Sequence, residues 1–194
     1  FMTFNAPRAY QIADRFRLEK GKTVIMGGYH PTFMPDEAIA HADAICIGEA
    51  EPNLPHLIED FISGKLQPFY KHGLADLGSL RPLNRGLLRR GLYLWADTMQ
   101  ATRGCRQRCT FCSITSFFGR QFRARPVEHV IDEIRSLGKR ILFMDDCLTT
   151  RSDYAKELFT HMIPLRKRWY SQCSISITED DELLQLAVRS GCSG

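Results

Sequence analysis

The stretch Thr102 to Thr115 reads TRGCRQRCTFCSIT and contains three of the seven cysteines in the chain. Their spacing is C-x3-C-x2-C, and no fourth cysteine follows nearby. A closed zinc site has four protein ligands, so three thiolates either lack a partner or leave one coordination position open. The fold expected around this stretch, and its function, depend on which of these two arrangements is present.

The composition is that of an ordinary globular protein. Of the 194 residues, 44% are hydrophobic and 25% are charged, which suffices for a core and for parts of two domains. The apolar runs are too short to cross a bilayer, and the first residues lack the features of a signal peptide. An odd number of clustered cysteines does not resemble a disulfide framework. We therefore expect a cytoplasmic protein with no transmembrane segment.

Charge is distributed unevenly along the chain. Residues 1–64 carry a net charge of −4, residues 65–125 one of +10 and residues 126–194 one of −2. An arginine-rich run can face a nucleic acid, although it is more often a solvated face or an anion-binding rim. No aromatic platform accompanies the arginines, so we expect no nucleic-acid partner.

Residues 1–64 alternate helical and strand patterns. Ala9, Ile12, Ala13 and Phe16 recur at helical spacing and predict the buried face of a first helix. The alternation that follows is typical of a parallel sheet with covering helices. The expected elements are strands at 22–28 and 43–48 and helices at 35–42 and 54–62.

Residues 98–194 repeat a strand–loop–helix pattern three times, after a segment at 65–97 that is rich in Gly, Pro and Arg and predicts little regular structure. Three such units form an incomplete barrel, so the chain is expected to be a fragment of a longer protein. The first of the three helices is expected to bury Val127, Val130, Ile131, Ile134 and Leu137. The three strands are expected at 99–104, 140–146 and 172–177.

The predicted fold class is therefore α/β. A partial Rossmann-like or flavodoxin-like parallel sheet is expected over residues 1–64 and a linker over residues 65–97. Residues 98–194 are expected to form the first three βα units of a TIM-like partial barrel. In such folds ligands gather at the carboxyl ends of the strands, and the cysteine loop follows the strand expected at 99–104.

The cysteine loop can hold a soft metal centre. Cys109 and Cys112 are three residues apart, so one turn can direct both sulfurs to the same centre, and Cys105 can reach it through a bend. Thiolates select zinc or iron–sulfur centres over hard cations. Three thiolates can bind three irons of a 4Fe–4S cube and leave the fourth open. Zinc would instead need a fourth ligand, from Cys147, Cys173 or a histidine.

The loop CRQRCTFC resembles the C-x3-C-x-aromatic-C signature of the radical S-adenosylmethionine enzymes, with Phe111 as the aromatic residue. The blocks FGRQFRARPVEHVIDEI, ILFMDDCLTT and SQCSISITEDDELLQLAVRSGC follow in matching order. Upstream, GGYHPTFMPDEAIAHADAICIGEAE looks like the second half of the cobalamin-binding domain that precedes one branch of this family. The resemblance covers nearly the whole chain.

The resemblance implies that Cys105, Cys109 and Cys112 bind a 4Fe–4S cluster whose open iron binds S-adenosylmethionine. One electron would cleave this cofactor into methionine and a 5′-deoxyadenosyl radical, which abstracts hydrogen from an unactivated carbon. The sequence has MDD where many relatives have G-G-E, so which acid contacts the cofactor is left open. The implied contacts to S-adenosylmethionine are Phe111, Asp145, Asp146 and Ser176, with Ser174 as a further candidate.

The resemblance also implies cobalamin at the carboxyl ends of the first two strands. Glycines there allow a ligand to approach the backbone closely. A histidine beside a proline and an acid at a helix N-terminus could equally have structural roles. No D-x-H-x-x-G motif occurs, so no histidine ligand to cobalt is expected from that motif. The implied cobalamin contacts are Gly27, Gly28, His30, Gly48 and Glu49.

The expected domains are the second half of a cobalamin-binding domain (1–64), the linker (65–97) and the first half of a radical S-adenosylmethionine domain (98–194). The resemblance implies methyl transfer to an unactivated carbon of a small-molecule or lipid-like substrate, with flavodoxin or ferredoxin as electron donor. Radical cyclisation or rearrangement with the same cofactors is an open alternative. A zinc-stabilised nucleic-acid-binding module is an alternative from a different class.

Overall fold

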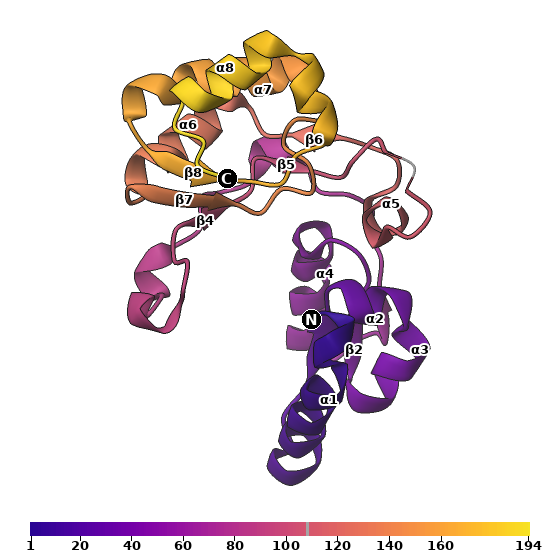
Figure 1. Ribbon diagram of the computed structural model, residues 1–194. Coiled ribbons are helices and arrows are strands. Elements are labelled where there is room, and N and C mark those ends of the chain that lie inside the picture. Colours follow the sequence, from indigo (N-terminus) through magenta and orange to yellow (C-terminus); the bar gives the residue numbers. More distant parts are fainter. Residues whose placement is uncertain (108) are drawn as a thin grey trace. The chain divides into compact units, whose positions relative to one another are not determined.

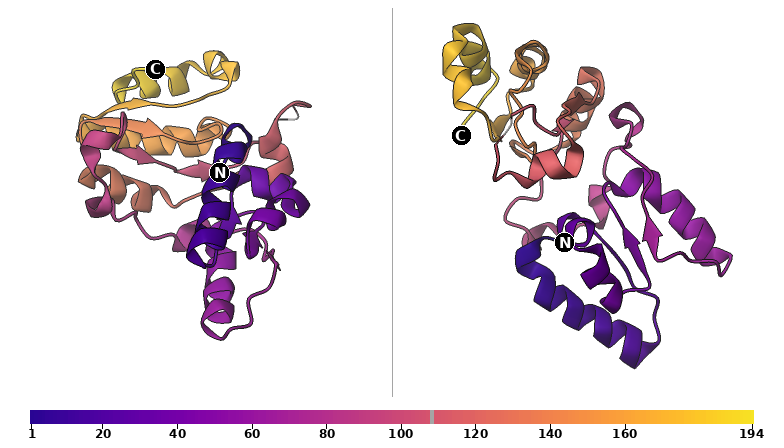
Figure 2. Two further views of the ribbon diagram at one scale, coloured as in Figure 1. Left: turned by 90° about the horizontal axis from the view of Figure 1, so that it is seen from below. Right: turned by 90° about the vertical axis from the view of Figure 1, so that its right-hand side faces the viewer.

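The computed structural model describes residues 1–107 and 109–194, so Arg108 of the basic segment lies outside the described residues. The chain forms two compact units, Phe1–Ala75 and Asp76–Gly194 (Figures 1 and 2). Each unit has a three-stranded parallel sheet with helices packed on it. The predicted α/β class with parallel sheets is therefore confirmed. No helix within the described residues is long and apolar enough to span a membrane.

The sheet of the first unit has the strand order β1-β2-β3. The two predicted strands are confirmed as β1 (Ile25–Gly27) and β2 (Ala44–Cys46). β3 (Phe69–Tyr70) pairs with β2 in parallel, within the segment for which little regular structure is expected, so that expectation is wrong here. Tyr70 accounts for the strand, because its buried ring joins the core and its hydroxyl donates to Asp60 at 2.8 Å.

The helices of the first unit surround this sheet. The predicted helix from Pro35 is confirmed and ends in a 3-10 turn, and the predicted helix at 54–62 begins four residues earlier, at Ala50. A short helix at Tyr29–Phe33 is an addition to the predicted set. The bounds are α1 (Ala6–Asp14, continued by a π-helix at Arg15–Glu19), α2 (Tyr29–Phe33), α3 (Pro35–Ala38), a 3-10 turn at Ile39–His41 and α4 (Ala50–Ile62).

The buried face of α1 is not the one predicted. Ala13 is buried as expected, but Ile12 and Phe16 are 44% and 51% exposed. Tyr10 faces the core instead, because its hydroxyl shares a hydrogen bond with His30 Nε2 at 2.9 Å. A buried tyrosine with a polar partner thus determines the orientation of the helix more strongly than the aliphatic periodicity does.

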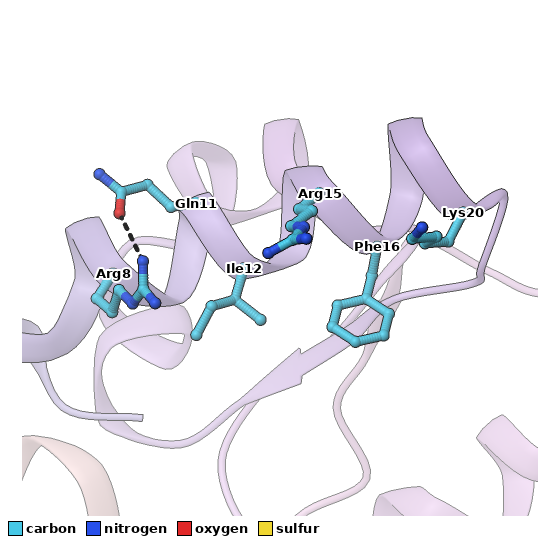
Figure 3. A pocket seen from close by; sticks show the side chains of 6 residues that line it. All are labelled: Arg8, Gln11, Ile12, Arg15, Phe16 and Lys20. Atoms are coloured by element: carbon cyan, nitrogen blue, oxygen red, sulfur yellow. Dashed lines mark hydrogen bonds between the residues drawn. The ribbon is translucent and has the colours of Figure 1, made fainter.

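The exposed face of α1 combines apolar and basic side chains. Together they line a shallow cavity of about 230 Å³ (Figure 3). The lining residues are Arg8, Gln11, Ile12, Arg15, Phe16 and Lys20.

The sheet of the second unit has the parallel order β4-β7-β8. The predicted strand at 99–104 is split into β4 (Thr98–Met99), which pairs with β7, and β5 (Thr102–Arg103), which forms an antiparallel hairpin with β6. The chain therefore leaves the sheet between Met99 and Thr102. The remaining strands are β6 (Arg123–Ala124), β7 (Arg140–Phe143) and β8 (Arg168–Tyr170).

The prediction of a strand at 172–177 is wrong. The strand, β8, ends before that range, at Tyr170, and residues Ile175–Glu179 form a 3-10 helix. Trp169 in β8 is buried and stacks on Phe159 at 4.8 Å between ring centroids. The Ser174 hydroxyl accepts from the Ser176 backbone N–H and so favours a turn over a strand. The bulky aromatic residue, rather than the alternation that follows it, places the strand in the core.

Three helices of the second unit cover one face of its sheet (Figure 1). The predicted apolar face of the first of them, α6, is confirmed, since Val127, Val130, Ile131, Ile134 and Leu137 are all buried. The helices are α5 (Ser113–Phe118) on the cysteine loop, α6 (Val127–Ser136), α7 (Ser152–Met162) and α8 (Asp181–Arg189). Short 3-10 turns lie at Leu77–Ser79, Arg85–Leu87, Arg90–Leu92 and Ile163–Leu165.

Truncation of a side chain in this core should destabilise the second unit strongly. Leu158 of α7 is fully buried in the core cluster, so Leu158→Ala is expected to lower the free energy of unfolding by about 2–5 kcal/mol. Val188 of α8 is 67% exposed, and Val188→Ala should change it by no more than about 0.5 kcal/mol. Denaturant unfolding of both variants measures this difference, and equal effects would contradict the core described here.

Candidate functional site

The three clustered cysteines line one cavity of about 340 Å³ in the second unit. The cavity lies where β7 and β8 end, because the residues that follow these strands form its opposite wall. Parallel strands bring their carboxyl ends to the same edge of a sheet, which is where ligands bind in this fold class. The lining residues are Cys105, Gln107, Cys109, Cys112, Ile114, Thr115, Asp146, Cys147, Cys173 and Ser174.

A tight turn leads into the cysteine loop. Gly104 has a φ of +82°, and a Cβ atom there would lie 2.1 Å from the carbonyl oxygen of Gln121. Only glycine fits this position, both for its conformation and for the close approach of the backbone. Beyond the turn, the Cys112 N–H donates to the Cys109 carbonyl at 3.2 Å. α5 begins at the next residue, Ser113, and closes the loop.

Hydrogen-bond donors surround the first cysteine. The Gln107 N–H donates to Cys105 Sγ at 3.5 Å, and the Thr150 hydroxyl lies within 3.8 Å of the same sulfur. Thr150 belongs to the loop after β7, so Cys105 is linked to the opposite wall of the cavity. Donors of this kind stabilise negative charge on a ligating sulfur.

The donor set fits an iron–sulfur cluster. Each cysteine of such a cluster binds a different iron, whereas the ligands of one zinc ion converge on a single atom. Cys105, Cys109 and Cys112 share one cavity, as the ligands of three irons of one cube must. Among the described residues, no three His, Cys, Asp or Glu side chains form a group that could hold a single metal ion.

The two adjacent acids at the end of β7 face different surroundings. Asp145 is only 3% exposed, and its carboxylate accepts hydrogen bonds from the Ala101 and Thr102 N–H groups and, at 2.6 Å, from the Thr102 hydroxyl. Burial raises the pKa of Asp145 to about 7, although these donors oppose the shift. Asp145 is therefore engaged with the backbone ahead of the cysteine loop.

Asp146 is the acid that lines the cavity. Its Oδ2 accepts from the Gly104 N–H at 2.8 Å, so it also contacts the turn into the loop. Burial raises the pKa of Asp146, and the nearby Arg103 charge acts in the opposite direction. Of the two acids, Asp146 lines the cavity, whereas the Asp145 carboxylate is directed to the backbone of Ala101 and Thr102.

Two other residues predicted to contact S-adenosylmethionine lie outside the cavity lining. Phe111, on the cysteine loop, is 89% exposed. Ser176 lies in a 3-10 helix rather than on a strand and is exposed, so its predicted strand position is wrong. Ser174 and Cys173 line the cavity instead, because β8 ends before them. The early end of β8 is signalled in the sequence by the aromatic pair Trp169 and Tyr170.

The glycines predicted to bind cobalamin lie at the carboxyl ends of β1 and β2 in the first unit. Gly28 and Gly48 both have positive φ, +97° and +82°. The Gly48 N–H donates to the Thr32 hydroxyl at 2.9 Å, which joins α2 to the loop after β2. A Cβ atom at Gly48 would meet nothing within 4 Å, whereas one at Gly28 would lie 2.5 Å from the Phe1 nitrogen, so of these two glycines Gly48 has the open space beside it.

The two charged or titratable residues predicted to bind cobalamin point into the first unit. His30 is buried and shares hydrogen bonds with Tyr10 at 2.9 Å and Glu37 at 3.3 Å. Glu49 is buried, and its Oε2 accepts from the Ala75 N–H at 2.5 Å. The fully buried Asn53 accepts from the His72 N–H at 2.9 Å. These side chains make hydrogen bonds within the first unit and so stabilise its loops. The sequence alone did not distinguish such a structural role from contact with a ligand.

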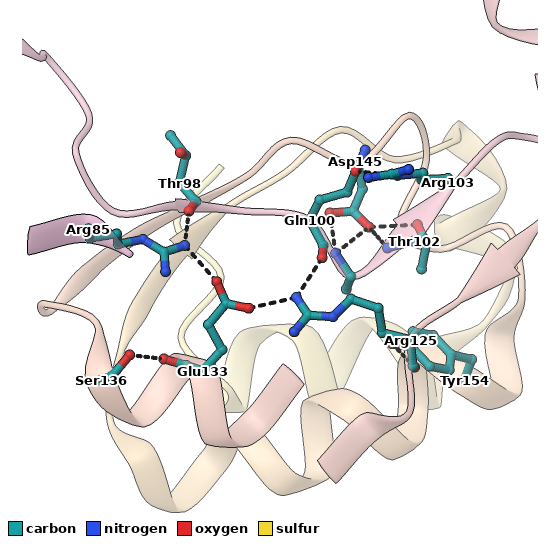
Figure 4. Close-up of polar contacts among 11 residues, drawn as sticks. Arg85, Thr98, Gln100, Thr102, Arg103, Arg125, Glu133, Ser136, Asp145 and Tyr154 are labelled. Atoms are coloured by element: carbon teal, nitrogen blue, oxygen red, sulfur yellow. Dashed lines mark hydrogen bonds and ion pairs between the residues drawn. The ribbon is translucent and has the colours of Figure 1, made fainter. Parts of the chain in front are cut away.

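A buried ion-pair network lies beside the start of the cysteine loop (Figure 4). Glu133 of α6 accepts from Arg85 at 2.6 Å and from Arg125 at 2.7 Å, and all three side chains are largely buried. Arg85 also donates to the Thr98 carbonyl, and Arg125 to the Gln100 carbonyl at 3.0 Å. This network was not predicted from the sequence. The one available signal was that Glu133 lies beside the buried apolar residues of α6 on the helix surface.

The comparisons with known proteins agree with this geometry. The chain is 36% identical to the bacteriochlorophyllide d C-12(1)-methyltransferase of Chlorobaculum tepidum, over 98% of this chain and 44% of that protein. It is 24% identical to the hopanoid C-3 methylase of Methylococcus capsulatus, over 93% of this chain and 39% of that protein. No family model matches the chain.

The fold is also similar to that of a solved structure. The radical S-adenosylmethionine methyltransferase TsrM from Kitasatospora setae, with cobalamin and a 4Fe–4S cluster bound, matches with a TM-score of 0.79 and 18% identity, over 98% of this chain and 45% of that chain. The chain is therefore similar in sequence to named methyltransferases, and similar in fold to a radical S-adenosylmethionine methyltransferase. It spans less than half the length of these relatives.

Replacement of Gly104 should disrupt the cysteine loop. Gly104→Ala combines left-handed strain with a clash against Gln121, so it should destabilise the protein and prevent the loop from binding iron. Gly119→Ala is the matched control, because Gly119 has a positive φ of +71° with a ψ of −175° but a Cβ atom there would meet nothing within 4 Å, so only backbone strain of about 1–3 kcal/mol is expected. Thermal unfolding and iron content test the pair, and equal behaviour of the two variants would contradict the close approach at Gly104.

The raised pKa of Asp145 predicts a pH dependence of stability. Its pKa is about 7 in the folded protein against an ordinary 3.8, so the folded state retains a proton that the unfolded state releases. The free energy of unfolding should therefore contain a contribution that falls as the pH rises from about 4 to about 7. Denaturant unfolding of the cluster-free protein and of Asp145→Asn across this range measures it. Parallel pH profiles for the two proteins would show that Asp145 titrates normally.

Proposed function

We propose that the cysteine cavity holds a 4Fe–4S cluster and S-adenosylmethionine, and that the enzyme methylates an unactivated carbon with the help of cobalamin. The observation that carries this proposal is the position of Cys105, Cys109 and Cys112 in one cavity, opposite Asp146, at the carboxyl edge of a parallel sheet. In this assignment residues 1–64 belong to the cobalamin-binding domain and residues 98–194 to the radical S-adenosylmethionine domain.

Cys105, Cys109 and Cys112 would ligate three irons of the cluster and leave the fourth for S-adenosylmethionine. Bound there, the cluster would supply the electron that cleaves S-adenosylmethionine to methionine and a 5′-deoxyadenosyl radical. The protein holds the ligands in place through the turn at Gly104. It also stabilises the Cys105 sulfur through donation from the Gln107 N–H.

Asp146 would accept a hydrogen bond from the amino group of the methionine moiety, because it is the acid of the MDD sequence that lines the cavity. Asp145 has its acceptor capacity directed to the Ala101 and Thr102 backbone and would not contact the cofactor. Phe111 projects from the cysteine loop into solvent, where its ring would be available to pack on the adenine.

Cobalamin would bind through the backbone at Gly27, Gly28 and Gly48, where the strands of the first unit end. His30 and Glu49 would support these loops from inside, since their side chains are engaged within the unit. When bound, cobalamin would carry the methyl group that is transferred. No residue of the described chain is assigned as a ligand to cobalt.

The substrate would be a small or lipid-like molecule with an unactivated carbon, by analogy with the bacteriochlorophyllide and hopanoid named for the relatives. Electrons would come from flavodoxin or ferredoxin. The support for this partner is electrostatic: Arg106 and Arg120 are exposed beside the cysteine loop, in the segment of net charge +10, and would attract an acidic donor.

Removal of one loop cysteine should abolish cluster binding. After anaerobic reconstitution the unmodified protein should be brown, absorb near 400 nm, and contain about four irons per chain. Cys109→Ala should lose this absorbance and the cleavage of S-adenosylmethionine, whereas Cys192→Ala, outside the cavity lining, should retain both. A colourless protein with one bound zinc, or retained cleavage in Cys109→Ala, would contradict the proposal.

A further inference from the structure

The segment that leads into the cysteine loop is buried but has left the parallel sheet. β4 ends at Met99, and Ala101 and Thr102 are both 0% exposed. Buried backbone N–H groups need an acceptor wherever a strand partner is missing. Asp145 provides one, since its carboxylate accepts from the Ala101 N–H at 3.2 Å and also from the Thr102 N–H.

The same segment is held from its carbonyl side by Arg125. The Arg125 N–H donates to the Ala101 carbonyl at 2.9 Å, and its guanidinium donates to the Gln100 carbonyl at 3.0 Å. Residues 100–102 therefore lie between a carboxylate that accepts and an arginine that donates (Figure 4). We call the four side chains Asp145, Arg125, Glu133 and Arg85 the polar clamp.

The polar clamp is joined to Cys105 through the backbone of residues 102–104. Two residues after Thr102, the Gly104 N–H donates to Asp146 at 2.8 Å, and the next residue is Cys105. Gly104 cannot shift toward Gln121, because the backbone already approaches that carbonyl closely. A displacement of Thr102 would thus be transmitted along a short, constrained path to the first sulfur.

We propose that Asp145 is a positioning residue for the iron–sulfur cluster, acting through the backbone of Ala101 and Thr102 on the placement of Cys105. Its neighbour Asp146 acts on the cofactor side of the same cavity. The two adjacent acids therefore have different roles. Asp145 determines how firmly the cluster is held, and Asp146 determines how S-adenosylmethionine is bound. This inference rests on the proposed function of the cysteine cavity.

Four variants of the cluster-loaded protein separate these roles. Asp145→Asn keeps the size of the side chain but removes its charge and leaves a single acceptor oxygen for the Ala101 N–H, the Thr102 N–H and the Thr102 hydroxyl. Thr102→Val removes only the hydroxyl that donates to Asp145, and Thr102→Ser is its conservative control because it keeps that hydroxyl. Asp146→Asn retains an acceptor for the Gly104 N–H and removes the charge that faces the cavity.

The first readout is the rate at which an iron chelator removes the cluster. Loss of supporting contacts around metal ligands typically costs 10–100-fold in affinity, so Asp145→Asn should release iron about tenfold or more faster than the unmodified protein. Thr102→Val should change the rate in the same direction. Thr102→Ser and Asp146→Asn should stay within about twofold of the unmodified protein, well below that range. Thermal unfolding of the cluster-free proteins identifies any variant that does not fold. If Asp145→Asn does not fold, the comparison of Thr102→Val with Thr102→Ser tests the positioning role.

The second readout is the electron paramagnetic resonance spectrum of the reduced cluster with and without S-adenosylmethionine. Asp145→Asn should alter the spectrum of the cofactor-free cluster yet keep the response to added S-adenosylmethionine, whereas Asp146→Asn should do the reverse. Unchanged iron release and spectrum in a folded Asp145→Asn, or equal effects in Thr102→Val and Thr102→Ser, would overturn the positioning role. An unmodified protein that takes up no cluster would overturn the proposed function as well.

Discussion

The burial of a short backbone segment outside the parallel sheet determines how the second unit is built. Ala101 and Thr102 lie in the interior without strand partners in the parallel sheet, and a single carboxylate, Asp145, accepts from both of their N–H groups. An unsatisfied buried donor costs about 1–3 kcal/mol, so this side chain cannot be replaced by an apolar residue without loss. Because the segment is satisfied in this way, the chain can leave β4, form the β5–β6 hairpin and present the cysteine loop at the edge of the sheet.

Part of the basic segment, residues 65–125, is buried in the structure instead of facing solvent. Arg85 and Arg125 are part of its charge of +10, yet both are buried against Glu133 and donate to backbone carbonyls of the first strand region. A buried charge is tolerated when it is paired and hydrogen-bonded. Both guanidinium groups have such partners, although the buried Arg125 Nε makes no hydrogen bond within the described residues. Some of the arginines therefore build the site from within, while Arg106 and Arg120 remain at the surface, where they could attract an electron donor.

Much of the fold follows from local pattern, and the failures have physical causes. The apolar face of α6 and the cysteine loop were predictable because periodicity and spacing are local properties of the sequence. The orientation of α1 was not, because Tyr10 depends on His30, twenty residues away. The role of Asp145 was hidden for the same reason: its partners are more than forty residues distant, and adjacent acids look alike in sequence. The roles of Phe111 and of the cobalamin glycines stay predictions.

Electron–nuclear double resonance of the reduced cluster tests the central claim most directly, namely that three cysteines leave one iron open for S-adenosylmethionine. With nitrogen-15 in the methionyl amine or oxygen-17 in its carboxylate, the spectrum should show hyperfine coupling from the labelled atom to the cluster, because that atom would bind the open iron. A cluster that shows no such coupling while S-adenosylmethionine is bound, or one whose fourth iron is ligated by a further cysteine, would contradict it.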